Sequence, residues 1–126
     1  MPASRSALKA SAELARALNL ASTGSRREAI VLLTQLAKRK PKDAMVWFRL
    51  GTMLDSSGRM AKAIPCYLRA LRLKPRHPHE YEMCLYLCSS YRKTKRPQAA
   101  RRWLKKAQSF SRNTPLQKRL ERSLKQ

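Results

Sequence analysis

Apolar side chains recur at helical spacing along most of the chain, and short polar stretches interrupt them at intervals. Trp47, Leu50 and Leu54 lie three or four residues apart, so they share one face of a helix. The polar stretch 56–58 then breaks the pattern, and a second series at the same spacing follows it. This spacing predicts two helices joined by a tight turn within residues 44–77.

Small and conformationally special residues mark where these two helices turn, approach each other and end. Gly58 can adopt the positive φ that a tight helix–helix turn requires. Gly51 and Ala63 have little side-chain volume, which favours a close approach of the two helices. Pro75 disfavours the helical conformation at Lys74 and so ends the second helix. The segment is therefore predicted to be a helix–turn–helix unit.

The same segment resembles the tetratricopeptide repeat (TPR), a helix–turn–helix unit of about 34 residues. Nine of its residues fall on positions that are typical of that family: Trp47, Leu50, Gly51, Leu54, Gly58, Ala63, Tyr67, Ala70 and Pro75. The resemblance implies that successive units stack side by side. It further implies that the first helices line a concave groove and that the second helices face outward.

A weaker copy of the unit precedes this segment, at residues 10–43. Its second helix matches the family pattern, but Glu13, Arg16 and Ala17 replace the aromatic residue, the leucine and the glycine of the first helix. These departures fit an end helix with one face in water.

A second weak copy follows at residues 81–112, three residues later than the period requires. The delay makes the segment 77–80 a longer turn between repeats. Beyond this copy, Leu116, Leu120 and Leu124 lie four apart and predict a helix over 115–126 that covers the last hydrophobic face of the stack.

The pattern as a whole predicts an all-α fold, a three-repeat TPR stack (an α-solenoid) with a C-terminal capping helix. The chain of 126 residues then forms a single domain over 1–126. No apolar run reaches the roughly 18–20 residues that span a bilayer, so no membrane span is predicted.

Charge changes the picture more than any other property of the composition. Twenty-nine Lys and Arg residues against seven Asp and Glu give a net charge of +22. Residues 91–126 hold thirteen of these bases and a single acid, Glu121. Such a chain should repel its own copies and bind polyanions or an acidic protein face.

The resemblance assigns many of the bases to second helices, and hence to the outer face. We name this set the basic face: Lys62, Arg69, Arg72, Arg101, Arg102, Lys105 and Lys106. A solvated face normally mixes both signs of charge, and this one does not. The basic face is thus a candidate contact surface for an acidic protein, or for RNA or the ribosome.

The resemblance likewise assigns a mostly apolar set to the concave groove: Leu14, Leu18, Met45, Phe48, Arg49, Thr52, Leu85, Ser89 and Arg92. Exposed apolar side chains in a groove suit a peptide or the apolar face of a partner helix. Alternatively, the chain's own residues 1–9 cover part of this surface.

No constellation of residues indicates catalysis, and neither a cofactor nor a metal is predicted. Cys84 and Cys88 lie one helical turn apart near His77 and His79, a set that could ligate a metal ion, but both cysteines also fall on packing positions of the repeat. Three cysteines at no framework spacing favour free thiols in a reducing compartment, the cytoplasm. The Ser/Ala/Arg-rich start, residues 1–20, leaves an organellar matrix as the alternative.

These features predict a non-enzymatic, chaperone-like adaptor that binds an acidic partner, as a peptide or an amphipathic helix, in its groove. The alternative is an RNA- or ribosome-associated protein that binds through the basic face and the C-terminal tail.

Overall fold

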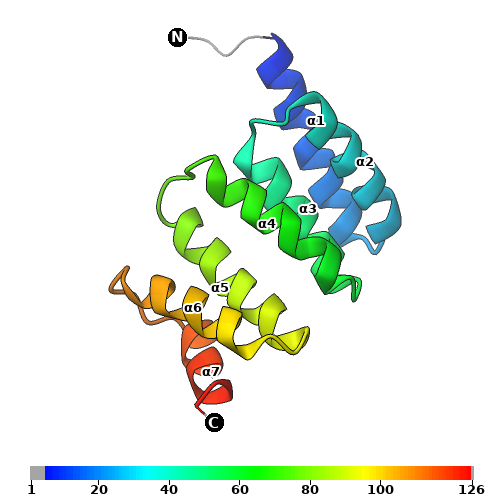
Figure 1. Cartoon of the computed structure of the whole chain (residues 1–126). Helices are drawn as coiled ribbons and strands as arrows, with labels where there is room; N and C mark the ends of the chain where they lie inside the picture. The colour runs from blue at the N-terminus through cyan, green and yellow to red at the C-terminus, as the bar shows by residue number, and fades with distance from the viewer. Residues whose placement is uncertain (1–4, 126) are drawn as a thin grey trace.

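The computed structural model describes residues 5–125, without the side chains of residues 6, 7 and 10. Seven α-helices follow one another in this part of the chain, and no strand occurs in it (Figure 1). They are α1 (Arg5–Ser22), α2 (Arg26–Arg39), α3 (Ala44–Ser56), α4 (Met60–Arg72), α5 (His79–Lys93), α6 (Pro97–Gln108) and α7 (Pro115–Ser123). The predicted all-α fold class is confirmed.

The helices form three antiparallel pairs that lie side by side, and α7 closes the end of the stack (Figure 1). Each helix packs mainly against its neighbours in the sequence, and α7 packs against both α5 and α6. The first helices α3 and α5 also contact each other, whereas α4 and α6 have at most marginal contacts. The first helices of the second and third pairs therefore lie closer together than their second helices do, which fits the concave side that the family resemblance implies for the first helices.

The turns inside the three pairs share one hydrogen-bonding scheme. The backbone N–H after each turn donates to a carbonyl five residues earlier: Ser25 to Leu20, Arg59 to Leu54 and Arg96 to Tyr91, each at 2.8 Å. Gly24 and Gly58 supply the positive φ in the first two turns, at 92° and 84°. Lys95 takes the same left-handed conformation in the third turn, with a φ of 63°, in the absence of a glycine. The pairs are thus built alike despite their different sequences.

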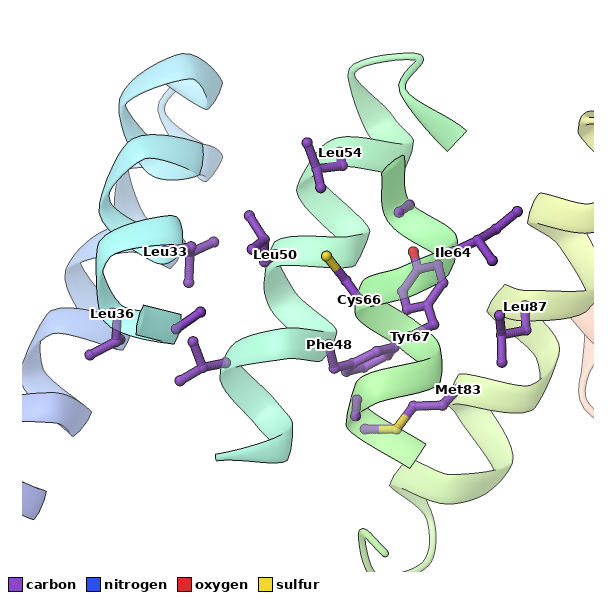
Figure 2. Packing of buried hydrophobic residues seen from close by; sticks show 14 of the residues in the cluster. Leu33, Leu36, Phe48, Leu50, Leu54, Ile64, Cys66, Tyr67, Met83 and Leu87 are labelled. Atoms are coloured by element: carbon purple, nitrogen blue, oxygen red, sulfur yellow. The ribbon is translucent and has the colours of Figure 1, made fainter. Parts of the chain in front are cut away.

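A continuous hydrophobic core joins the first two pairs to α5 (Figure 2). At its centre Phe48 of α3 and Tyr67 of α4 are buried, with ring centroids 5.9 Å apart. Tyr86 of α5 contacts both rings, at 5.4 Å from Phe48 and 5.9 Å from Tyr67. Three aromatic side chains from three helices therefore connect the second repeat to the third.

Gly51 of α3 makes room for the Tyr67 ring. A Cβ at this position would lie 2.6 Å from Cε1 of Tyr67, which is fully buried and has no space to move. We expect Gly51→Ala to lower the free energy of unfolding by about 1–3 kcal/mol, because overpacking outweighs the higher helix propensity of alanine. Urea unfolding followed by circular dichroism measures this. Unchanged or raised stability would show that α3 and α4 can move apart at no cost.

The first pair keeps the register of the repeat although its first helix departs from the family pattern. Ala17 is fully buried at the position that Gly51 occupies in the second pair. Arg16 is exposed, and Glu13 forms an ion pair with Arg39 of α2. The guanidinium of Arg39 lowers the pKa of Glu13 through their hydrogen bond. The two polar departures from the family pattern, Glu13 and Arg16, thus lie on the solvent-facing side of an end helix.

Helix boundaries differ from the prediction at three places. α7 ends at Ser123, although a helix over 115–126 was predicted. α1 begins at Arg5, five residues before the predicted start of the first repeat. α5 begins at His79, so the predicted turn over 77–80 is wrong in its second half. Pro78 precedes the first turn of α5, and Glu80 in that turn favours the helix dipole, which allows the helix to start early.

Helix α7 is held in place by polar anchors as well as by its leucines. Thr114 caps it by accepting a hydrogen bond from the Gln117 N–H at 3.4 Å, and Pro115 occupies its first turn. The hydroxyl of Tyr81 lies 2.9 Å from the Thr114 hydroxyl and donates to Oε1 of Gln117 at 2.7 Å. With Leu120 buried against α5 and α6, α7 is an integral part of the domain.

Candidate functional site

The concave side of the stack carries a strip of partly accessible side chains from α1 and α3. Leu14, Leu18, Met45, Arg49 and Thr52 are all half-buried there. Arg92 of α5 is exposed. That these six residues line a groove for a partner stays a prediction.

Phe48 was predicted to line this groove, and the structure corrects that prediction. Its side chain is 1% exposed. The rings of Tyr67 and Tyr86 pack against it, and the guanidinium of Arg49 lies 5.5 Å from its ring centroid. Phe48 is a core residue that supports the concave surface from below.

Leu85 and Ser89 of α5 are also buried, at 3% and 9% exposure. Leu85 belongs to the hydrophobic cluster that α7 completes with Leu120 and Leu124. The capping helix thus covers the part of α5 that the family pattern would leave open. The groove prediction is wrong for Leu85, whereas Ser89 still lines a pocket at the edge of α7.

This pocket lies between α3, α5 and α7 and has a volume of about 380 Å³. We name it the α5–α7 pocket. Its walls consist of Asp55 from α3, of Tyr86, Ser89, Arg92 and Lys93 from α5, and of Leu116, Arg119, Leu120 and Ser123 from α7. Three cationic side chains therefore face one carboxylate.

Asp55 is tied into the structure by several partners. It is 10% exposed, and its Oδ1 lies 3.7 Å from Nζ of Lys93. Its Oδ2 accepts hydrogen bonds from the Tyr67 hydroxyl at 3.3 Å and from the Ser90 hydroxyl at 3.4 Å. Burial and the nearby Asp55 carboxylate both raise the pKa of Tyr67, so that its hydroxyl remains a donor. The charge of Asp55 is thus largely engaged before any ligand binds.

A larger hollow of about 680 Å³ opens at the edge of the stack, where the α2–α3 and α4–α5 connections meet. Its walls include Met45 and Pro75 together with the basic residues Arg39, Lys42 and Arg76. Sequence analysis predicted Met45 as a groove residue but not this hollow, because the hollow forms only when two loops 30 or more residues apart lie side by side.

All seven residues of the basic face are exposed. Helices α4 and α6, which carry them, contain no acidic residue. Three of these bases contact their own domain. The guanidinium of Arg69 lies 4.8 Å from the Trp47 ring centroid, and Nζ of Lys106 lies 5.7 Å from the Trp103 ring centroid. Nε of Arg101 donates to the Leu124 carbonyl at 3.2 Å. The prediction that this face binds a partner stays a prediction.

The four residues of the alternative metal set do not come together. Cys84 and Cys88 are fully buried, and burial raises the pKa of each thiol to about 11. His77 is exposed and stacks on Phe110 at 6.0 Å. Among the described side chains, no three His, Cys, Asp or Glu residues form a group that could hold a metal ion.

The alternative that the N-terminal residues cover the groove falls partly outside the described chain. Residues 1–4 lie outside it, and residues 5–9 form the first turns of α1. None of the helices between residues 5 and 125 is long and apolar enough to cross a membrane.

Sequence comparison identifies the family. The family model for the tetratricopeptide repeat matches residues 14–78, just over half of the chain. The chain belongs to the TPR family. No curated protein gives a significant match to its sequence.

Solved TPR structures share the fold over most of the chain. The translocator chaperone SycD of Yersinia enterocolitica superimposes with a TM-score of 0.80 at 19% identity, covering 98% of this chain and 85% of SycD. A second SycD structure, in complex with a peptide of the translocator YopD, has the same TM-score and identity, covering 97% of this chain and 92% of SycD. The N-terminal domain of stress-induced protein-1 from C. elegans superimposes with a TM-score of 0.84 at 12% identity, covering 96% of this chain and 98% of that domain. MamA (AMB-1) superimposes with a TM-score of 0.67 at 31% identity, covering 74% of this chain and 53% of MamA.

Sequence reasoning missed the contribution of α7 to the concave side. Arg119 and Ser123 immediately precede Leu120 and Leu124, so they lie on the flank of the apolar stripe of this TPR domain. The stripe was interpreted as a cover alone. The same periodicity could have placed Arg119 at the border between α7 and the groove.

Proposed function

We propose that this TPR protein is a non-enzymatic adaptor that holds a peptide or an amphipathic helix of a partner protein on its concave side. The observation that carries the proposal is the strip of half-buried side chains on the inner helices. Leu14, Leu18 and Met45 expose apolar surface there, with Arg49 and Arg92 at its edges. This combination suits a peptide with an apolar face and acidic flanks.

A structural neighbour supports the same mode of binding. SycD, which shares this fold over nearly the whole chain, has been solved with a peptide of YopD. At 19% identity the likeness concerns the fold, so the chemistry of the partner has to come from this chain's own side chains. Its net charge of +22 favours an acidic partner, because long-range attraction speeds the encounter.

A second candidate function is binding to RNA or to the ribosome through the basic face. The absence of any acid from α4 and α6 favours it, since nothing on these helices offsets the positive charge. If six or seven of these bases contacted phosphates, affinity would fall by about 10³–10⁴-fold between about 50 and 200 mM salt. The chain shows no device for reading bases, so such binding would be non-specific.

We further place the protein in a reducing compartment such as the cytoplasm, with an organellar matrix as the alternative. Its three cysteines are free and buried, in α4 and α5. Buried free thiols act as small hydrophobic side chains and need no oxidising environment.

Affinity capture with wild-type protein and two variants tests the adaptor function. Thr52→Arg introduces a long cationic side chain on the concave side, and Arg102→Glu, Lys105→Glu and Lys106→Glu together reverse charge on the basic face. Capture is performed with and without nuclease at about 50 and 200 mM salt. We expect one protein partner to survive nuclease. Its recovery should fall about tenfold or more with Thr52→Arg, because the long side chain obstructs the concave side and a charge set against the apolar face of the peptide costs about 1.4 kcal/mol or more.

The basic-face variant is the control, and it omits Arg101 because that side chain bonds the end of α7. We expect it to alter the salt dependence of capture and to keep the partner. Recovery that is lost with nuclease, or that depends only on the basic face, would contradict the adaptor function and support the RNA candidate.

A further inference from the structure

The α5–α7 pocket is a polar hollow at the C-terminal end of the concave surface. It combines two exposed arginines from different helices, Arg92 and Arg119, with the serine hydroxyls of Ser89 and Ser123. We propose that this pocket takes an acidic side chain of the bound peptide, an inference that rests on the proposed adaptor function. Arg92 and Arg119 would pair with the carboxylate.

The distribution of charge in the pocket singles out these two arginines. Nζ of Lys93 forms an ion pair with Oδ1 of Asp55 at 3.7 Å. The hydroxyls of Tyr67 and Ser90 donate to the other oxygen of the same carboxylate. Neither Arg92 nor Arg119 has an acidic side chain within ion-pair distance among the described residues. Two uncompensated guanidinium groups therefore remain on one small hollow, and their mutual repulsion falls when an anion binds.

The shape and walls of the pocket favour a carboxylate on an aliphatic stem. Leu116 and Leu120 of α7 form an apolar wall that can contact the methylene groups of a Glu or Asp side chain. The planar guanidinium fork matches the two oxygens of a carboxylate. Asp55 in the wall disfavours a phosphate dianion more than a singly charged carboxylate, because its own negative charge repels the higher charge more strongly.

This inference gives α7 a second role. The helix covers the last hydrophobic face of the stack through Leu120 and Leu124, and it also supplies half of the cationic pair through Arg119. Because Arg119 is exposed and Leu120 is buried beside it, the two roles can be separated by substitution.

Selection of short random peptides on immobilised protein tests the pocket. The peptides are presented internally, so that their only carboxylates are Asp and Glu side chains. Four proteins are compared: wild type, Arg119→Glu, Thr52→Arg and the matched control Lys118→Glu. Lys118 is the exposed neighbour of Arg119, and it lies with Glu121, Arg122 and Lys125 outside the pocket. Both charge reversals change the net charge equally, so any difference between them reports position.

We expect wild type and Lys118→Glu to select peptides with Asp or Glu at one fixed position. Replacing that residue by Asn or Gln should weaken binding about tenfold or more, because a charge-assisted pair contributes about 1.5–3 kcal/mol. Arg119→Glu should bind the selected peptides about tenfold or more weakly and should lose the preference for an acid at that position.

Two results would overturn the inference and leave the adaptor function standing: selected peptides without a fixed acid, or an acid preference that persists in Arg119→Glu. Failure to select any peptide, or peptides indifferent to Thr52→Arg, would instead contradict the adaptor function itself. Thermal unfolding of each variant establishes that it is folded, as the exposed position of Arg119 leads us to expect.

Discussion

Replacing Phe48 by Asp should unfold the domain rather than remove a single binding contact. The ring is 1% exposed and packs against Tyr67 and Tyr86, so the substitution leaves a cavity in place of the ring and buries a charge. Removal of a buried aromatic ring costs about 3–5 kcal/mol, and an unpaired polar group adds about 1–3 kcal/mol. Since a small domain is stable by only about 5–15 kcal/mol, we expect loss of most or all of its stability. Urea unfolding monitored by circular dichroism measures the change.

Thr52→Asp is the matched control on the same face of α3. Thr52 is half-buried and bonds only the Arg49 carbonyl, at 2.8 Å, so its replacement leaves the aromatic cluster intact. We expect a change of less than about 1 kcal/mol, as for most partly exposed positions. Equal stability of the two variants would mean that Phe48 does not belong to the core. The comparison also shows why Phe48 is unsuitable for testing the groove.

Local chemistry explains why the fold could be predicted. Gly58 and Pro75 act through their own backbone conformation, and a substitution nearby does not alter what they require. Gly51 and Tyr67 form a size match between two helices that are adjacent in sequence. All the residues that carry these signals lie within one repeat. A single well-formed copy was therefore sufficient to predict the helix pairs on either side of it.

The accessible surface could not be predicted in the same way, because exposure depends on residues far away in the sequence. Phe48 is covered by Tyr86, which comes from the next repeat, and Leu85 is covered by α7. A family pattern describes a repeat inside a long array. In a stack of three, the last repeat meets a capping helix instead, and the groove is partly filled.

The spacing of about 34 residues between repeats has a similar effect on charge. Lys93 and Asp55 pair across two repeats, which leaves Arg92 as the uncompensated neighbour although both bases are adjacent in sequence. A count of bases along the chain treats Arg92 and Lys93 alike. Only the packing of α3 against α5 distinguishes a base that stabilises the domain from one that is available to a ligand.

Raising the pH from about 8 to about 10 is expected to destabilise the domain through its buried thiols. Burial raises the pKa of Cys66, Cys84 and Cys88 to about 11. In the unfolded chain these thiols ionise at about 8.5–9, so above that pH the unfolded state releases protons that the folded state keeps. Stability therefore falls as pH rises through this window, by roughly 4–6 kcal/mol in total for the three thiols by about pH 10. Urea unfolding at a series of pH values, under reducing conditions, measures the slope.

The variant in which all three cysteines are replaced by alanine isolates this contribution. Alkaline pH also neutralises lysines, which weakens the repulsion within a chain of net charge +22 and acts in the opposite direction in both proteins. The alanine substitutions lower stability by an amount that does not depend on pH, because they remove packing alone. The difference between the two proteins should therefore shrink or reverse as pH rises. A constant difference across the series would mean that the three thiols ionise as readily in the folded domain as in the unfolded chain, and hence that α4 and α5 open to water far more often than their packing implies.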